Sequence, residues 1–258
     1  MTTAIDPTRK DGYGWRMSDS ERLDRRLDRV VRKRGQPQPF SAIAATEQIV
    51  KHLGRPIDME RADQLLAEAD DRIRREWLDR KAEILLSRLP ARYRDAHYIA
   101  NQAGKQAKRW ADDYRNGARN GLVILGTVGT GKTWLAASIA RDLMINGTPV
   151  PVTFITVADM LAELRTARPG LDVDMAQFML APVLILDDLG LENTTDWTRE
   201  QLYRLSHARY HEGRPTIVTS NLTGDEIQSQ YEARTVQRLF GGAKLITLAG
   251  ESRRELPF

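Results

Sequence analysis

The chain contains no cysteine among its 258 residues. Disulfide bonds and thiolate metal sites are therefore excluded, and with them any zinc-binding module of the cysteine type. No apolar run approaches the roughly 18 residues of a membrane span, and the first residues lack the apolar core of a secretory signal. We expect a cytoplasmic protein that holds no zinc and does not enter a membrane.

Positive charge is concentrated in the first half of the chain. Residues 1–120 carry 26 Lys and Arg against 19 Asp and Glu, whereas residues 121–258 carry 13 against 16. A basic first half of the chain, followed by a slightly acidic second half, suggests an anionic partner, and nucleic acid is the first candidate. A solvated helical surface would have the same composition, so charge alone leaves both interpretations open.

Hydrophobic patterning divides the chain into three parts. Residues 1–17 are polar and rich in turn residues, which predicts a disordered tail. Residues 18–89 show helical spacing of apolar side chains and are too thinly apolar to fold robustly alone. Their apolar stripes either pack on one another, dock on the rest of the chain or meet a partner protein.

From Pro90 onward, short apolar segments alternate with helical patterns. The expected strands are 122–125, 152–157, 183–186, 216–220 and 244–248. Such alternation predicts a parallel sheet with helices on both faces. The expected fold class is therefore α/β, a three-layer domain over residues 90–258 preceded by a small all-helical region.

A phosphate-binding loop follows the first expected strand. It reads Gly126-Thr127-Val128-Gly129-Thr130-Gly131-Lys132-Thr133 and matches G-x-x-x-x-G-K-[ST]. Backbone N–H groups of such a loop surround phosphate oxygens, and the following helix adds the positive end of its dipole. Lys132 is expected to reach the β- and γ-phosphates of ATP, and the Thr133 hydroxyl to bind Mg²⁺.

Polar side chains end two further apolar strands. Asp187 is expected to hold Mg²⁺ through its water shell, and Asp188 to orient and polarise an attacking water. Asn221 is expected to reach the γ-phosphate or that water, because ligands gather at the carboxyl ends of parallel strands. A helix cap or a turn is the alternative explanation at each of these positions.

Basic side chains near the end of the chain are further candidates. The arginines after Arg214 are Arg234, Arg238, Arg253 and Arg254. Phosphoryl transfer needs cations that stabilise the transition state, although each arginine could equally be a surface residue. His207 and His211 lie four residues apart on an expected helix, but no third ligand is evident, so we expect surface residues there.

These motifs, in this order, resemble the AAA+ ATPases of the DnaC/DnaI helicase-loader and IstB transposition-helper group. The likeness runs from about Leu89 to Arg254, and Asp187-Asp188 followed by Leu-Gly is more specific for it than the phosphate loop. The resemblance implies that Asn221 is sensor 1 and that Tyr93 lies in a segment bordering the adenine pocket.

The resemblance also implies roles for the basic residues. Arg238 would be the arginine finger offered to a neighbouring subunit, with Arg234 beside it, and Arg254 would be sensor 2. Members of the group form rings or spirals that bind single-stranded DNA through the elements after strand two, where this chain holds Arg165 and Arg168. Because the chain ends four residues after Arg254, we expect no helical lid, which argues against a DnaA-like initiator.

The first functional hypothesis is an ATP-dependent loader for DNA replication. It would grip a replicative hexameric helicase through helices of residues 18–89 and deliver it onto single-stranded DNA. The alternative is an IstB-type transposition helper that binds DNA and recruits a transposase. A small-molecule kinase and a purely structural DNA-binding module fit less well, because Asp187-Asp188, Asn221 and the trailing arginines favour water as the acceptor. Asp188 is one methylene shorter than the usual Glu, which predicts slow ATP turnover regulated by DNA or a partner.

Overall fold

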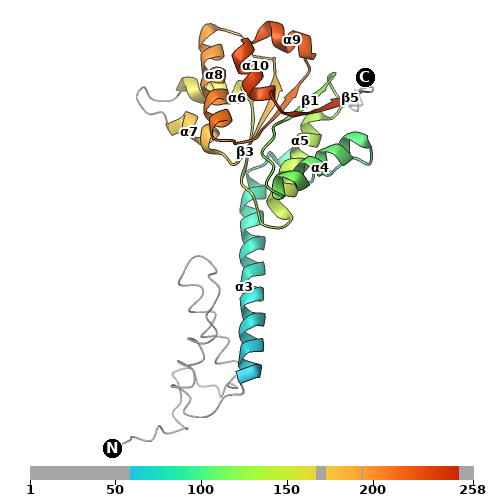
Figure 1. The fold of residues 1–258 in the computed structure, drawn as a ribbon, viewed down its shortest axis with the longest axis vertical. Coiled ribbons are helices and arrows are strands. Elements are labelled where there is room, and N and C mark those ends of the chain that lie inside the picture. The colour runs from blue at the N-terminus through green and yellow to red at the C-terminus, as the bar shows by residue number, and fades with distance from the viewer. Residues whose placement is uncertain (1–58, 167–172, 193, 250–258) are drawn as a thin grey trace, which may run out of the picture. The chain divides into compact units, whose positions relative to one another are not determined.

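The computed structural model describes residues 59–166, 173–192 and 194–249 (Figure 1). The chain divides into two units, Met1–Arg80 and Lys81–Phe258, and α3 (Met59–Ser87) crosses the boundary between them. The expected tail and the expected helices before residue 58 lie outside the described residues, so the predicted domain limits stay predictions. Three candidate site residues also lie outside them: Arg168, Arg253 and Arg254.

Five parallel strands form the sheet of the second unit (Figure 1). They are β1 (Leu122–Gly126), β2 (Val152–Thr156), β3 (Val183–Leu189), β4 (Thr216–Ser220) and β5 (Lys244–Leu248). Their order is β2-β3-β4-β1-β5, so β1 lies between β4 and β5. The expected bounds of the last two strands are confirmed to the residue.

Three strand limits differ from expectation, and the first difference is that β1 ends at Gly126, one residue later than expected. Val157 was assigned to a strand but is the first residue of a helix. β3 continues past its apolar run to Leu189, and its register with β4 shifts between Leu186 and Leu189. Within this irregularity Asp188 has a φ of 57°, which is uncommon for a residue other than glycine. A hydrophobic pattern that stops at Leu186 cannot reveal a ladder that resumes after a bulge.

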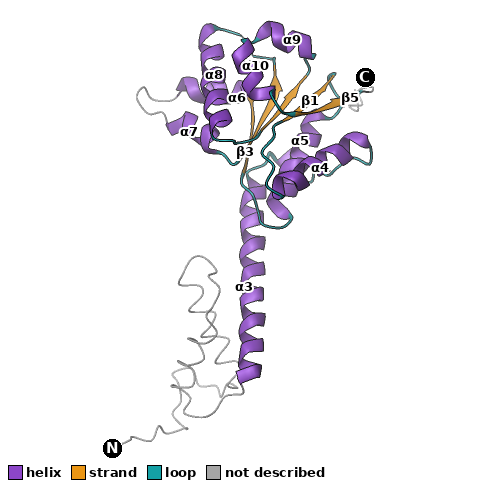
Figure 2. Cartoon of the chain, viewed as in Figure 1, coloured by secondary structure: helices purple, strands orange, loops and turns teal. Residues whose placement is uncertain are grey.

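Helices cover both faces of the sheet (Figure 2). One face packs against α4 (Gln102–Arg115) and α5 (Lys132–Ile145). The other face packs against residues of five helices: α6 (Val157–Thr166), α7 (Val173–Leu180), α8 (Asp196–His211), α9 (Gly224–Gln230) and α10 (Ala233–Phe240). Alternate residues of β3 divide between the faces: Val183 and Ile185 join the first cluster, and Leu184 and Leu186 the second. The predicted three-layer α/β fold is confirmed.

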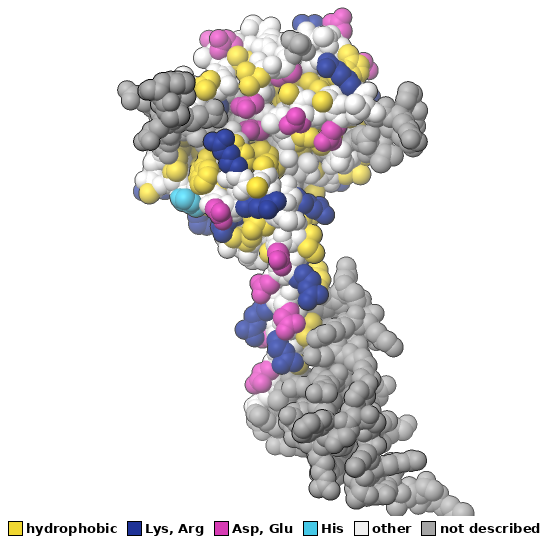
Figure 3. All heavy atoms as spheres, turned by 180° about the vertical axis from the view of Figure 1, so that it is seen from behind, with side chains coloured by type: hydrophobic (Ala, Val, Ile, Leu, Met, Phe, Trp, Pro, Cys, Tyr) yellow, Lys and Arg dark blue, Asp and Glu magenta, His cyan; other side chains and the backbone are white. Residues whose placement is uncertain are grey.

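The end of α3 belongs to the second unit. Leu85 and Leu89 are buried in the same apolar cluster as Trp110 of α4, and the 3₁₀ turn η1 (Ala91–Tyr93) follows Pro90. Along the face of α3 visible in Figure 3, basic and acidic side chains alternate instead of forming a stripe of one sign. Within the described part of the chain, no helix has the length and apolar character required to cross a bilayer.

Candidate functional site

The predicted phosphate loop connects the end of β1 to the start of α5. Gly131, the residue before α5, has a φ of 93°, a left-handed conformation that glycine adopts without strain. A Cβ at Gly126 would lie 2.5 Å from the carbonyl oxygen of Leu248, so a side chain there would push β1 away from β5. The glycines therefore permit both the tight turn and the close packing of the two strands.

The side chain of Lys132 joins the loop to the end of β4. Its Nζ donates hydrogen bonds to the carbonyl oxygens of Gly126 at 2.8 Å and Thr127 at 2.9 Å, and also to Oδ1 of Asn221. Lys132 is only 5% exposed. The structure therefore brings together Lys132 and Asn221, which were both expected to reach the γ-phosphate.

Asp187 lies in the same group of side chains. Its carboxylate is buried and accepts hydrogen bonds from the hydroxyl groups of Thr219, at 2.6 Å, and Thr133. Burial raises the pKa of Asp187 to about 6, and the neighbouring charge of Asp188 adds to this effect. The two hydroxyl groups and the charge of Lys132 oppose the rise. A carboxylate this strongly desolvated is well suited to neutralisation by a cation.

The donor set fits the predicted magnesium site. The Thr133 hydroxyl and the Asp187 carboxylate lie in direct contact beside the phosphate loop, and both are hard oxygen ligands. Mg²⁺ prefers such ligands and is usually held by one or two carboxylates together with substrate phosphates and water. These two residues would hold the ion.

Sequence analysis did not identify Thr219 as a functional residue. Its hydroxyl accepts a hydrogen bond of 2.9 Å from the backbone N–H of Asp188 while it donates to Asp187. Next to it, Ser220 Oγ donates to the Leu189 carbonyl at 2.6 Å, so two consecutive hydroxyl groups of β4 secure the bulge in β3. The available sequence signal was the pair of hydroxyl residues directly before Asn221, at the end of an apolar strand segment.

The segment containing Tyr93 runs along α5. The Tyr93 ring lies 5.8 Å from the Phe154 ring of β2. Closer to the loop, the His97 carbonyl accepts hydrogen bonds from Trp134 Nε1 at 3.0 Å and Ser138 Oγ at 2.8 Å. Trp134 is two residues after Lys132, so this segment borders the helix that begins at the loop. The adenine contact of Tyr93 stays a prediction.

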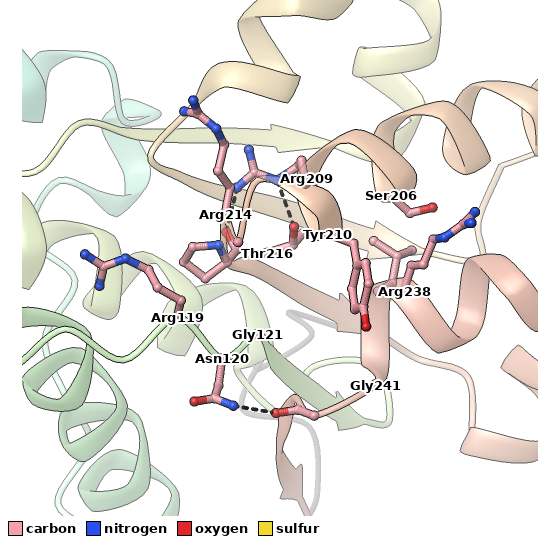
Figure 4. Close-up of a pocket in the computed structure, with 14 residues that line it drawn as sticks. Arg119, Asn120, Gly121, Ser206, Arg209, Tyr210, Arg214, Thr216, Arg238 and Gly241 are labelled. Atoms are coloured by element: carbon pink, nitrogen blue, oxygen red, sulfur yellow. Dashed lines mark hydrogen bonds between the residues drawn. The ribbon is translucent and has the colours of Figure 1, made fainter.

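Arg238 lies away from the phosphate loop of its own chain. It lines a cavity of about 160 Å³ with Gly121 and Thr216, which mark the amino ends of β1 and β4 (Figure 4). The guanidinium groups of Arg119, Arg214 and Arg238 point in different directions from this cavity, so they do not converge on one anion (Figure 4). The phosphate loop, by contrast, follows the carboxyl end of β1.

The remaining candidates occupy helices on one face of the sheet. Arg165, in the last turn of α6, holds its guanidinium carbon 4.9 Å from the ring centroid of Trp197 at the start of α8. Arg234 is exposed on α10. His211 is exposed, as expected, and His207 is partly exposed although its Nδ1 is buried. Among the described residues, no three His, Asp or Glu side chains gather as a metal cluster.

Comparison with known proteins identifies relatives with two different roles. The chain is similar to the replicative helicase loader DnaI of Bacillus subtilis, with 30% identity over 154 residues, 54% of this chain and 49% of DnaI. It is also similar to y4pL of Sinorhizobium fredii, named an insertion sequence ATP-binding protein, with 33% identity over 155 residues, 56% of this chain and 59% of y4pL. The chain thus spans about half the length of the curated relatives it matches.

Solved structures and a protein family agree with this likeness. The crystal structure of the DnaC helicase loader superposes with a TM-score of 0.54 at 23% identity, covering 62% of this chain and 100% of that one, which shows a shared fold. The sequence matches the family of IstB-like ATP binding proteins over residues 58–255. Because this match spans most of the chain and includes the phosphate loop and both carboxylates, the chain belongs to the IstB-like family of ATP-binding proteins, with a P-loop AAA+ fold like that of DnaC and DnaI.

Proposed function

We propose that this chain is an ATP-hydrolysing loader that delivers a replicative hexameric helicase onto single-stranded DNA. The observation that carries the ATPase part is the meeting of Lys132, Asp187 and Asn221 at one edge of the sheet, although they come from three separate elements. An ammonium, a buried carboxylate and an amide at one site suit a nucleoside triphosphate with its metal ion better than any neutral ligand.

Each residue of this group has a distinct task in hydrolysis. Lys132 exchanges its hydrogen bonds to the loop for the β- and γ-phosphates. Thr133 and Asp187 would hold Mg²⁺, which would supply positive charge beside the phosphates. Asp188 accepts the proton of a water molecule whose oxygen attacks the γ-phosphorus, while the bond to the β-phosphate breaks and ADP leaves. Asn221 orients that water or the γ-phosphate.

The site is completed by cations from outside this cluster. Arg238 lies at the other end of the strands from the phosphate loop, so it acts on the nucleotide of a neighbouring subunit in an assembly of several copies. Arg254 acts as sensor 2 in its own chain, with Arg253 beside it. Arg234, exposed four residues before Arg238, contributes further positive charge to the same contact.

The relatives supply the loading part of the proposal. DnaI and DnaC are named replicative helicase loaders. The helicase would dock on the helical region of residues 18–89, and single-stranded DNA would contact α6 and the segment after it, which hold Arg165 and Arg168. The second candidate function, an ATP-dependent transposition helper, is favoured by the similarity to y4pL and by the IstB-like family.

Helicase loading onto a closed circle of single-stranded DNA tests the proposal. The chain, the replicative helicase of the same organism and ATP would be mixed with the circle, and circle-bound helicase would be measured after a high-salt wash. We expect loading with the natural chain and none with Lys132→Ala, although Lys132→Ala should still co-purify with the helicase. Lys105→Ala, which removes an exposed lysine of α4, serves as the matched control.

Two results would contradict the loader. One is the absence of any complex between the natural chain and the helicase, and the other is equal loading without nucleotide. ATP-dependent binding to duplex DNA together with capture of a transposase would favour the transposition helper instead.

A further inference from the structure

The guanidinium of Arg238 lies on an aromatic ring of the neighbouring helix. Its central carbon is 4.7 Å from the ring centroid of Tyr203 on α8. A hydrogen bond from Arg238 and the positive charge of its guanidinium lower the pKa of the Tyr203 phenol, so the two side chains also interact through their polar groups. α8 and α10 pack together, and the buried side chains Thr235 and Leu239 flank Arg238 on α10.

Tyr203 is itself held by a stack along α8. Its ring lies 5.8 Å from the ring of His207 with an angle of 5° between the planes. The His207 ring meets the edge of His211 at 4.3 Å and 82°. The spacing 203, 207, 211 places all three rings on one side of the helix, because residues four apart are neighbours on its surface. The stack restricts the rotamers open to the Tyr203 ring.

This arrangement holds the cation while leaving part of its donors unused. No ion pair joins Arg238 to another described residue. Its Nη1 is buried inside the chain, so the remaining N–H groups of this partly exposed side chain are the ones that can meet another molecule. A carboxylate partner would occupy two N–H groups and cancel the charge, whereas an aromatic face attracts the guanidinium plane and leaves N–H groups available. An arginine that must bind a phosphate supplied by another molecule needs this combination of fixed position and free donors.

We propose that Tyr203 is a positioning residue, which holds Arg238 in the orientation from which its free N–H groups reach the nucleotide of the neighbouring subunit. This inference rests on the proposed function, since it requires Arg238 to act in trans. In this role Tyr203 does not bind the nucleotide itself. Its contribution is the direction and restricted motion of the guanidinium, and the aromatic ring, more than the hydroxyl group, provides it.

A subunit-mixing experiment separates this role from a structural one. Asp188→Asn chains carry an intact Arg238 but an inactive site, and Arg238→Ala chains carry an intact site but no finger. Mixing the two creates interfaces at which an intact site meets an intact finger, so ATPase activity should appear. Tyr203→Leu is then added to one of the two chains at a time, and ATP hydrolysis is measured at saturating ATP.

The outcome should depend on which chain carries the substitution. In the Asp188→Asn chain, which supplies the finger, Tyr203→Leu should lower the recovered kcat roughly 10- to 100-fold, since small misplacements of a catalytic group cost this much. In the Arg238→Ala chain it should have no effect. Tyr203→Phe, which keeps the ring, and Tyr210→Leu, which removes an exposed ring of the same helix, should leave the recovery intact in either chain.

Each contrary result has a definite meaning. If Tyr203→Leu lowers activity equally in both chains, its role is structural and the inference is wrong. If the mixture in which the Asp188→Asn chain carries Tyr203→Leu recovers full activity, the inference is also wrong, but Arg238 remains an arginine finger that acts in trans. If the parent mixture recovers nothing, the trans role of Arg238 fails and the inference fails with it. Tyr203→Gln, which also removes the ring, replaces Tyr203→Leu if the latter does not fold.

Discussion

The hydroxyl group of Thr219 donates a hydrogen bond of 2.6 Å to Oδ1 of Asp187. Thr219 Oγ1 also accepts a hydrogen bond from the backbone N–H of Asp188 at 2.9 Å, so one side chain of β4 fixes two consecutive carboxylate residues of β3. Asp188 has left-handed backbone geometry, which costs free energy and persists only where surrounding contacts impose it. Thr219 therefore supports both the proposed magnesium ligand and the residue proposed to activate water.

Thr219→Val tests this support, because it keeps the shape of the side chain and removes the hydroxyl group. The N–H of Asp188 loses its partner and Asp187 loses one of the hydrogen bonds that favour its ionised form. We expect ATP hydrolysis to fall about 10- to 100-fold, as for other residues that orient a metal ligand, while binding of a fluorescent ATP analogue changes little. Thr219→Ser should retain most of the activity. Equal activity of the valine and serine variants would contradict the role of the hydroxyl group.

Arg209 should be essential for stability, although it lies outside the proposed site. It is 1% exposed, and its guanidinium donates to carbonyl oxygens of Phe178, Ala181 and Pro215 at 2.6 to 2.8 Å and to Thr216 Oγ1 at 2.9 Å. The end of α7 and the start of β4 thus share one planar donor. Burial lowers the pKa of Arg209 to about 9, and the neighbouring charge of Arg214 adds to this effect.

Arg209→Lys should lower the free energy of unfolding by at least about 3 kcal/mol, since several buried carbonyl groups lose their donors and a lysine cannot reproduce the planar geometry. Urea unfolding followed by circular dichroism measures the change. Arg214→Lys is the matched control, because Arg214 is half-buried and, among the described residues, its guanidinium bonds to a single carbonyl, that of Leu180. A loss for Arg209→Lys no larger than that of the control would show that the buried hydrogen bonds contribute little.

The parts of the site that sequence could predict are those encoded locally. The phosphate loop carries its function in eight consecutive residues, and Asp187 follows an apolar strand that hydrophobic patterning reveals. Thr219 and Tyr203 could not be assigned roles in the same way, because each acts through a residue on another element. Their roles depend on which strand lies beside β3 and which helix lies beside α10, and single-sequence patterns determine neither.

Acid should destabilise the chain partly through Asp142 of α5. Burial raises the pKa of this carboxyl, but hydrogen bonds from Asn146, Arg115 and Tyr98 outweigh burial, so the pKa lies below its usual value. The unfolded chain therefore takes up the proton first as the pH falls, and the stabilisation from Asp142 is present above about pH 4 and lost below it.

Asp142→Asn should accordingly be less stable than the natural chain near neutral pH, with the difference shrinking as the pH falls below about 4. Free energies of unfolding from urea titrations at a series of pH values measure this convergence. For Asp95→Asn, at an exposed position, the difference in free energy of unfolding from the natural chain should be the same at every pH. A constant difference between Asp142→Asn and the natural chain would mean that packing, not charge, is what the substitution removes.

Arg165 provides a test of the proposed DNA contact. Its guanidinium lies over Trp197, and it is exposed at the end of α6, so a nucleic acid phosphate can reach it. Each phosphate contact to single-stranded DNA contributes about −0.7 to the slope of log affinity against log salt concentration. Arg165→Ala should therefore weaken binding to all DNA sequences and make that slope shallower by about 0.7, whereas Arg165→Lys should preserve the slope.

Fluorescence anisotropy of a labelled oligonucleotide between about 50 and 200 mM salt measures both the affinity and the slope. Arg199→Ala is the control, because Arg199 forms an ion pair of 3.0 Å with Asp196, and both residues lie on α8. If Arg165→Ala and Arg199→Ala shift the slope equally, α6 has no special place in DNA binding and the contact must be sought on another element.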